Sequence, residues 1–260
     1  MQFKFKKIAQ ILGAIVFIIS PLKMQAQNNN QWFLWDSSAK LPVKEGLSNA
    51  IIGVSNGVLL VAGGNNFDKP LQQGGVKRVH DQIYVATDAK KIDWKNVGRL
   101  PFPLANAAVV PFNNGLLVIG GTDGENISDK VFLLMWNAGN QKIEIDSSFT
   151  KLPIPLSSLA AARIGNTIYV AGGQDTNGQI KHVFYELKVK ENGSAIGSQW
   201  KALKAWPGEA KFGAVMVAQS NGEYDCIYLF GGKGANGYSK DVFSFDPKKE
   251  QWQKKAPLPR

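Results

Sequence analysis

Cysteine is almost absent from this 260-residue chain, and histidine is nearly as rare. The single cysteine, Cys226, excludes an internal disulfide, and its place in the apolar segment CIYLF indicates a small buried side chain. No spacing typical of a zinc or calcium site appears, and no glycine-rich phosphate loop precedes a helix. We therefore predict no metal and no cofactor, and a fold that depends on a large hydrophobic core.

Long apolar runs are absent except at the N-terminus. There, MQFKFKK is followed by the apolar run IAQILGAIVFIIS and then by MQA. A basic start, a short apolar run and a small residue for cleavage predict a signal peptide over residues 1–26. An uncleaved anchor is the alternative. Export predicts a periplasmic or secreted protein without membrane attachment after cleavage.

Acidic residues are fewer than basic ones, which gives a formal net charge of +10. Removal of the four lysines in residues 1–26 would lower this charge to +6. The remaining lysines are scattered, which is typical of a solvated basic surface but also favours an acidic ligand. A nucleic-acid partner does not fit an exported chain.

Glycine is abundant and falls in a repeat of about 54 residues. Each repeat has a turn pair, an apolar strand, a glycine pair and an aliphatic-aromatic step. The glycine pairs are Gly63-Gly64, Gly120-Gly121, Gly172-Gly173 and Gly231-Gly232. In three of the four repeats a tryptophan then precedes a Leu-Pro or Trp-Pro end by six residues, and the exception has Asp146 in its place.

This pattern predicts four short antiparallel strands, a to d, in each repeat, and no helical periodicity interrupts them. Such a sheet cannot bury both faces alone, so the repeats are expected to pack side by side as blades of a β-propeller with strand a innermost. The predicted blades cover residues 43–101, 102–153, 154–207 and 208–259, within a propeller domain over 27–260.

Alternating strands place the loops after the glycine pairs and the proline corners at one end of the propeller, its mouth. The first blade takes 20 residues from its glycine pair to strand c, whereas the others take 11. This insertion is either a neutral surface loop or a ligand-contacting loop. The candidate ligand contacts at the mouth are Asn65, Asn66, Asp68, Lys77, Arg78, His80, Gln174 and Lys233.

The four repeats resemble Kelch repeats. The segments VAGGNNFDKPLQQGGVKRVHDQIYV and LLVIGGTDGENISDKVFLL are further similar to the cyclically permuted sialic acid mutarotases, relatives of N-acetylneuraminate epimerase. That resemblance implies a six-bladed propeller that interconverts the anomers of N-acetylneuraminate, an acidic sugar. A carboxylate would act as the base, and an arginine or lysine would hold the carboxylate of the sugar.

The chain departs from this pattern in two ways. Residues 32–42 read as an extra outer strand without a partner, which indicates a fragment with four of six blades; a four-bladed propeller with a spare strand is the alternative. The residues after the glycine pairs include no carboxylate, and Asp123 and Asp175 come one position later. The sequence therefore names no catalytic residue and predicts a poor mutarotase. Arg163, at the far end of a strand a, is a poor candidate to hold the sugar.

A Kelch propeller that binds a glycan or a protein without catalysis is the main alternative, because one fold hosts both functions. A copper-radical oxidase would need two histidines, tyrosines and a reactive cysteine around one metal. With His80, His182 and a cysteine inside an apolar strand, the chain does not fit that class.

Overall fold

The computed structural model describes residues 40–88, 91–190 and 197–259. The predicted signal peptide and most of the predicted outer strand 32–42 lie outside these residues, and residues 40–42 contain no strand. No helix in the described part of the chain is long and apolar enough to cross a membrane.

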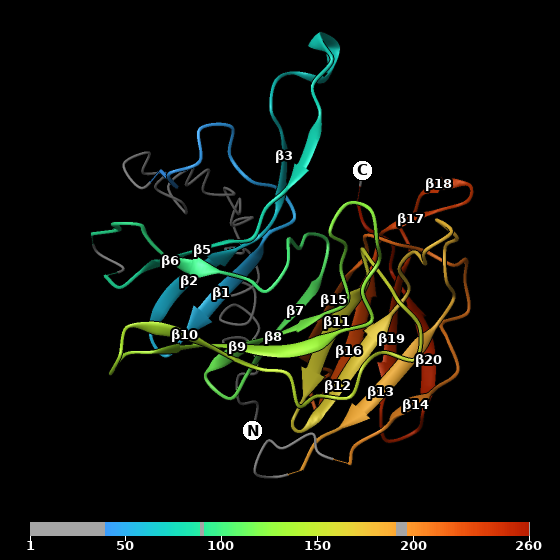
Figure 1. The fold of residues 1–260 in the computed structure, drawn as a ribbon. Helices are drawn as coiled ribbons and strands as arrows, with labels where there is room; N and C mark the ends of the chain where they lie inside the picture. The colour runs from blue at the N-terminus through green and yellow to red at the C-terminus, as the bar shows by residue number, and fades with distance from the viewer. Residues whose placement is uncertain (1–39, 89–90, 191–196, 260) are drawn as a thin grey trace, which may run out of the picture. The chain divides into compact units, whose positions relative to one another are not determined.

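The predicted all-β fold is confirmed, and the described residues form four-stranded antiparallel sheets (Figure 1). The first sheet contains β1 (Ile51–Ser55), β2 (Val58–Ala62), β5 (Gln82–Ala86) and β6 (Lys95–Arg99). The second contains β7 (Ala108–Phe112), β8 (Gly115–Ile119), β9 (Val131–Asn137) and β10 (Lys142–Asp146). The third contains β11 (Ala160–Ile164), β12 (Thr167–Ala171), β13 (Phe184–Lys188) and β14 (Trp200–Ala202). The fourth contains β15 (Val215–Ser220), β16 (Asp225–Phe230), β19 (Val242–Asp246) and β20 (Gln251–Lys255).

The innermost position of strand a is also confirmed. Neighbouring sheets contact each other through β1 and β7, β7 and β11, and β11 and β15, which are the first strands of their blades. Side chains of β7, β11 and β15 line an open groove of about 370 Å³ between the second, third and fourth blades. The last strand of each blade carries mostly exposed or half-buried side chains.

A separate hydrophobic cluster fills each space between neighbouring blades. Leu60 packs with Leu116 between the first two blades, and Leu117 packs with Ile168 between the second and third. Phe184 and Phe245 pack between the third and fourth, with ring centroids 4.8 Å apart. Each sheet therefore buries its apolar face against the next sheet, as the repeat pattern requires.

The repeat tryptophans of the third and fourth blades fasten each of these blades to the one before it. The indole nitrogen of Trp200 donates a hydrogen bond to the carbonyl oxygen of Thr150 in the preceding corner, at 3.0 Å. Trp252 makes the same bond to Lys204, at 2.9 Å. In the second blade, Asp146 stands in this position and accepts a hydrogen bond from the main-chain nitrogen of Ser148 instead.

A second connection runs through main-chain atoms only. The N–H of Asn106 donates to the oxygen of Asn49, Ser158 donates to Asn106, and Gly213 donates to Ser158, at 3.1, 2.8 and 2.7 Å. These four residues, here called the relay residues, precede strand a in successive blades. All four have a positive φ in the left-handed region, a conformation that asparagine and glycine adopt more readily than other residues.

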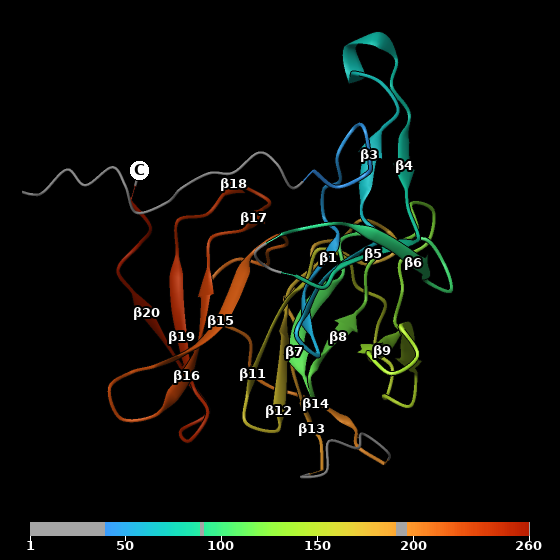
Figure 2. The same cartoon turned by 90° about the vertical axis from the view of Figure 1, so that its left-hand side faces the viewer.

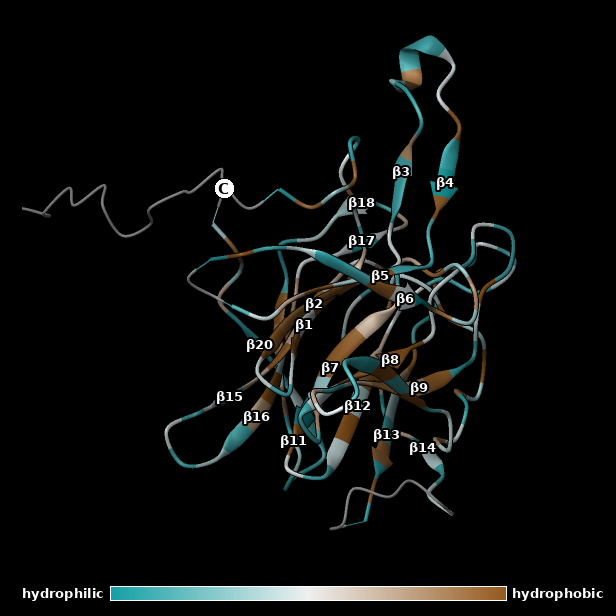
Figure 3. Ribbon diagram, turned by 60° about the vertical axis from the view of Figure 1, so that its left-hand side comes forward, coloured by the Kyte–Doolittle hydropathy of each residue, from teal (hydrophilic) through white to brown (hydrophobic). Residues whose placement is uncertain are grey.

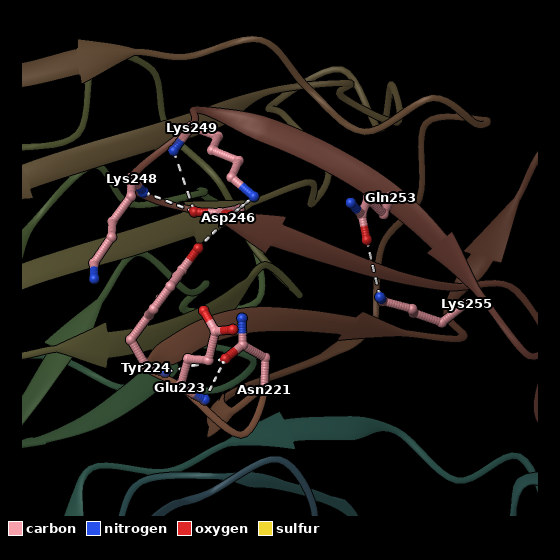
Figure 4. Close-up of polar contacts among 8 residues, drawn as sticks. All are labelled: Asn221, Glu223, Tyr224, Asp246, Lys248, Lys249, Gln253 and Lys255. Atoms are coloured by element: carbon pink, nitrogen blue, oxygen red, sulfur yellow. Dashed lines mark hydrogen bonds and ion pairs between the residues drawn. The ribbon is translucent and has the colours of Figure 1, made fainter.

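At the end of the sheets opposite the mouth, side chains tie the turns of the fourth blade together (Figure 4). The hydroxyl of Tyr224 donates to Asp246 at 2.8 Å, and the main-chain nitrogens of Lys248 and Lys249 donate to the same carboxylate. Burial raises the pKa of Asp246, but these hydrogen bonds outweigh it and leave the pKa below its usual value.

Candidate functional site at the mouth

The glycine pairs hold the mouth together by close main-chain contacts. The second glycine of the first pair, Gly64, donates a hydrogen bond to the oxygen of Leu104 in the corner that leads to the next blade, at 2.8 Å. A Cβ atom on Gly63 would lie 2.2 Å from the same oxygen, and the φ of Gly63 is positive, so only glycine fits there. The pairs thus bring the loops after strand b against the corners, as the sequence predicts.

The long crossing of the first blade lies at this mouth. Its base is fixed by the N–H groups of Leu100 and Leu104, which donate to the oxygens of Asp81 and His80 at 2.7 and 3.0 Å. In two views at right angles, the crossing projects from the same end of the sheets as the small turn formed by β17 (Lys233–Gly234) and β18 (Gly237–Tyr238) (Figures 1 and 2).

The inserted residues form a β-hairpin rather than an irregular loop. β3 (Asn65–Phe67) pairs with β4 (Lys77–Val79), and the 3-10 helix η1 (Leu71–Gln73) lies at the tip. Asp68 accepts a hydrogen bond from the N–H of Val76 at 2.8 Å and forms an ion pair with Arg78 at 3.1 Å. These two interactions lower the pKa of Asp68 and hold the two strands together.

A pocket of about 520 Å³ lies between this hairpin and the segment before β1, and we call it the hairpin pocket. Its polar side chains are Glu45, Ser48, Asn65, Asn66 and Lys69. Its other lining residues are Gly46, Leu47, Phe67, Pro70 and Leu71. The pocket therefore combines a carboxylate, a cation, two amides and an apolar wall, a mixture suited to a small polar ligand.

Two asparagines form one side of the hairpin pocket. Asn65 is only 3% exposed, and its Oδ1 accepts a hydrogen bond from the hydroxyl of Ser48 at 2.9 Å. Its Nδ2 has no hydrogen-bond partner. Asn66 is held by two contacts: its Nδ2 donates to the oxygen of Gly46 at 3.0 Å, and its Oδ1 lies 2.8 Å from Nε2 of His80.

The structure separates the eight predicted contacts into three groups. Asn65 and Asn66 line the pocket. His80 does not line it but contacts Asn66 through its Nε2 atom. Asp68, Lys77 and Arg78 belong to the same hairpin but do not line the pocket. Gln174 and Lys233 lie in the third and fourth blades, where Gln174 bonds within its own turn and Lys233 lies over the ring of Tyr238.

Sequence reasoning missed Glu45, Ser48 and Lys69. Glu45 precedes strand a, and no motif marks that position. Ser48 was detectable in principle, because the residue after each glycine pair forms a β-bridge with the residue three positions before strand a. Lys69 reaches the pocket only because the insertion folds as a hairpin.

The two alternative carboxylates are already occupied. Asp123 accepts hydrogen bonds from the N–H groups of Asn126 and Glu125, which lower its pKa. Asp175 pairs with Lys181 at 2.6 Å, and this contact together with turn N–H groups lowers its pKa. Both therefore stabilise turns. Arg163 lies over the ring of Phe112 in the groove between the innermost strands, away from the mouth.

No cluster of three or more histidine, cysteine, aspartate or glutamate side chains suited to a metal occurs among the residues that the structure describes. Cys226 is buried, as its apolar surroundings in the sequence indicate. Burial raises the pKa of its thiol, so the thiol is a poor nucleophile.

Four-stranded blades joined by glycine pairs, with fastening tryptophans and a pocket at the mouth, define a Kelch-type β-propeller. The chain belongs to the Kelch-repeat family: residues 48–258 match the family described as the KLHDC2/KLHL20/DRC7 Kelch-repeats domain.

Part of the chain is also similar to N-acetylneuraminate epimerases. The epimerase of Vibrio cholerae is 33% identical over 126 residues, which cover 42% of this chain and 32% of that protein. The epimerase of Haemophilus influenzae strain PittEE is 32% identical over 126 residues, with 42% and 33% covered. The matches thus span about a third of the length of these relatives.

A solved structure described as the structure of YjhT has the same fold. It superimposes with a TM-score of 0.63 at 17% sequence identity, and the match covers 82% of this chain and 71% of that chain. At this identity the similarity supports the propeller fold alone.

Proposed function

We propose that this chain acts as a sialic acid mutarotase, which interconverts the anomers of N-acetylneuraminate in the hairpin pocket. The similarity to N-acetylneuraminate epimerases supports the substrate. The observation that carries the proposal is the presence of Glu45, Asn65 and Lys69 around one pocket at the mouth of the propeller. A carboxylate, an amide and a cation are the groups that a hydroxylated acidic sugar needs.

The reaction requires only proton transfers and the opening and closing of the sugar ring. A base takes the proton of the anomeric hydroxyl, the ring C–O bond breaks, and the protonated base gives this proton to the released ring oxygen, which yields the open keto form. On closure, the same hydroxyl attacks the other face of the carbonyl, gives up its proton to the base, and the new anomeric oxygen receives it. Glu45 is the carboxylate that lines the pocket and would accept this proton. The ammonium group of Lys69 would hold the carboxylate of the sugar.

Glu45 changes the expectation of a poor catalyst. The sequence predicts a poor catalyst because none of the residues after the glycine pairs is a carboxylate that could act as the base. Glu45 supplies a carboxylate to the pocket from a different place, the segment before β1.

NMR exchange spectroscopy between the two anomers of N-acetylneuraminate tests the proposal. We expect the purified chain to accelerate exchange, and Glu45→Gln to lower the acceleration by roughly 10²–10⁴-fold, the usual contribution of a general base. Glu223→Gln is the matched control, because Glu223 lies in the turn network at the opposite end of the sheets (Figure 4). Exchange at the rate of buffer alone would refute catalysis by this chain.

Binding without catalysis is the second candidate function. The hairpin exposes Phe67, Leu71 and Val76, at 40%, 63% and 59%. In Figure 3 the hairpin that carries β3 and β4 is largely hydrophilic and is interrupted by short apolar stretches. Exposed apolar groups on a projecting element favour contact with a partner. Saturation transfer to the sugar without faster anomer exchange would support this function instead.

A further inference from the structure

The amide nitrogen of Asn65 is an exception within the described residues. It is the only buried side-chain nitrogen or oxygen there without a hydrogen-bond partner. A buried donor left without a partner destabilises the fold, so native proteins rarely keep one without a reason. A ligand with an oxygen that accepts this bond would remove the cost.

At the equivalent positions of the next two blades, the side-chain donors have hydrogen-bond partners. In the second blade, the hydroxyl of Thr122 donates to the oxygen of Asn126 at 2.8 Å. In the third, Nε2 of Gln174 lies 3.4 Å from the oxygen of Gly178. Both partners belong to the short turn that follows the glycine pair. The first blade has the hairpin instead of this turn, so the donor of Asn65 is left for another group.

The residues around Nδ2 of Asn65 restrict which chemical groups of a ligand could bind there. Phe67 follows two residues later in β3, and alternation puts both side chains on one face of the strand. Leu47 and Leu71 extend the apolar side of the pocket, and the charged groups of Glu45 and Lys69 are exposed to solvent. The side of the pocket formed by Asn65 and these apolar residues therefore suits a neutral group that carries one acceptor oxygen beside an apolar end.

We propose that the hairpin pocket contains a subsite for an acetamido group, whose carbonyl oxygen accepts a hydrogen bond from Nδ2 of Asn65 while its methyl group packs against the apolar wall. This inference rests on the proposed function for the sugar, but it concerns selectivity rather than catalysis. The ligand class is an acidic amino sugar with an N-acetyl substituent, and Asn65 is its specificity-determining residue.

Calorimetric titration with two sugars tests the subsite. One is N-acetylneuraminate, and the other is its deaminated analogue with a hydroxyl in place of the acetamido group. We expect the analogue to bind roughly 10- to 100-fold more weakly, because a site built around a buried donor rejects a ligand that leaves it unpaired. Asn65→Asp removes the donor but keeps an oxygen for Ser48, and it should abolish most of this preference.

Two further variants separate a ligand contact from a structural role. Asn65→Ala should also lose the preference, since the main-chain pairing of residue 65 with Ser48 does not need its side chain. Thr122→Ala, at the equivalent position of the second blade, should keep it. Circular dichroism and thermal unfolding verify that each variant folds.

The outcomes distinguish this inference from the proposed function. Equal binding of the two sugars by the unaltered chain, or a preference that survives in both Asn65 variants, overturns the subsite while sugar binding stands. Failure of both sugars to bind overturns the proposed function, and the subsite with it.

Discussion

The indole nitrogen of Trp252 lies 2.9 Å from the carbonyl oxygen of Lys204 and joins the fourth blade to the corner of the third. We expect Trp252→Phe to keep the aromatic contacts with Phe184 and Phe245 but to lose this bond. The free energy of unfolding should fall by about 1–2 kcal/mol, the value of one hydrogen bond plus a little packing. Denaturant unfolding measures it. Trp200→Phe should behave alike, and an unchanged midpoint in both variants would contradict a fastening role.

Replacing the hairpin separates the fold from the site. We expect a chain in which residues 66–78 are exchanged for the short turn 175–179 of the third blade to fold, because the hydrogen bonds of the relay residues lie outside the replaced segment. Sugar binding should be lost, because half of the pocket is removed. Thermal unfolding and calorimetry test the two expectations separately. Unchanged sugar binding would mark the insertion as a neutral surface loop.

Lys211 is only 2% exposed and occupies a position that carries leucine in the preceding blades. Its main-chain oxygen accepts from Gly173 as those of Leu104 and Leu156 accept from Gly64 and Gly121. Burial lowers the pKa of Lys211, so its charge destabilises the fold at neutral pH.

Lys211→Leu should therefore raise the free energy of unfolding by about 1 kcal/mol at pH 7. The unfolded chain binds the proton more tightly, so the unaltered protein should gain stability as the pH rises through the folded-state pKa of Lys211 toward that of a free lysine. The variant should lack this rise. Lys130→Leu, at an exposed lysine, serves as the control. A less stable Lys211 variant would show that the contacts of the ammonium group with Ser239 and Trp206 outweigh its burial.

The carboxylate of Asp246 predicts an acid-sensitive fourth blade. Its folded-state pKa lies below the ordinary value, so its stabilisation is fully present above the pKa of an unfolded aspartate and disappears as the pH falls through the folded-state value. Tyr224→Phe removes one of its hydrogen bonds and should lower the melting temperature at pH 7 more than at pH 3. Equal effects at the two pH values would contradict the assignment.

Intact mass spectrometry of the exported protein tests the predicted signal peptide. We expect a chain that begins at Gln27, after cleavage behind Ala26. Recovery of a species that retains Met1 would favour the uncleaved anchor.

The sequence predicted most of the fold because the repeat combines local signals. Pairs such as Asn56-Gly57, in which both residues have a positive φ, start a tight turn wherever they stand between apolar strands, and the glycine pairs end strand b for steric reasons. Four copies in register therefore predicted the strand order and the mouth. Each of these short-range signals is a weak predictor of structure alone, but their agreement across four copies makes the prediction specific.

The site was less predictable because it breaks the repeat. The insertion was visible as extra residues, but its length does not show that it pairs as β3 and β4 or that Lys69 turns toward the segment before β1. Glu45 belongs to no strand and no motif. The amide nitrogen of Asn65 is unpaired because the hairpin has no carbonyl oxygen in the place where the short turns of the next two blades supply one. This difference is visible only in the three-dimensional structure.

The relay residues give the row of blades a direction. Every step from Asn49 to Gly213 has its N–H pointing back toward the earlier blade, so the bond dipoles add instead of cancelling. Among the described residues, one end of this line offers the N–H of Asn49 and the other the oxygen of Gly213. Any blade added there, from whatever polypeptide, must follow the same polarity: an acceptor ahead of Asn49 and a donor behind Gly213. Because only main-chain atoms take part, the rule constrains backbone conformation and leaves the side chains of such a blade free to vary.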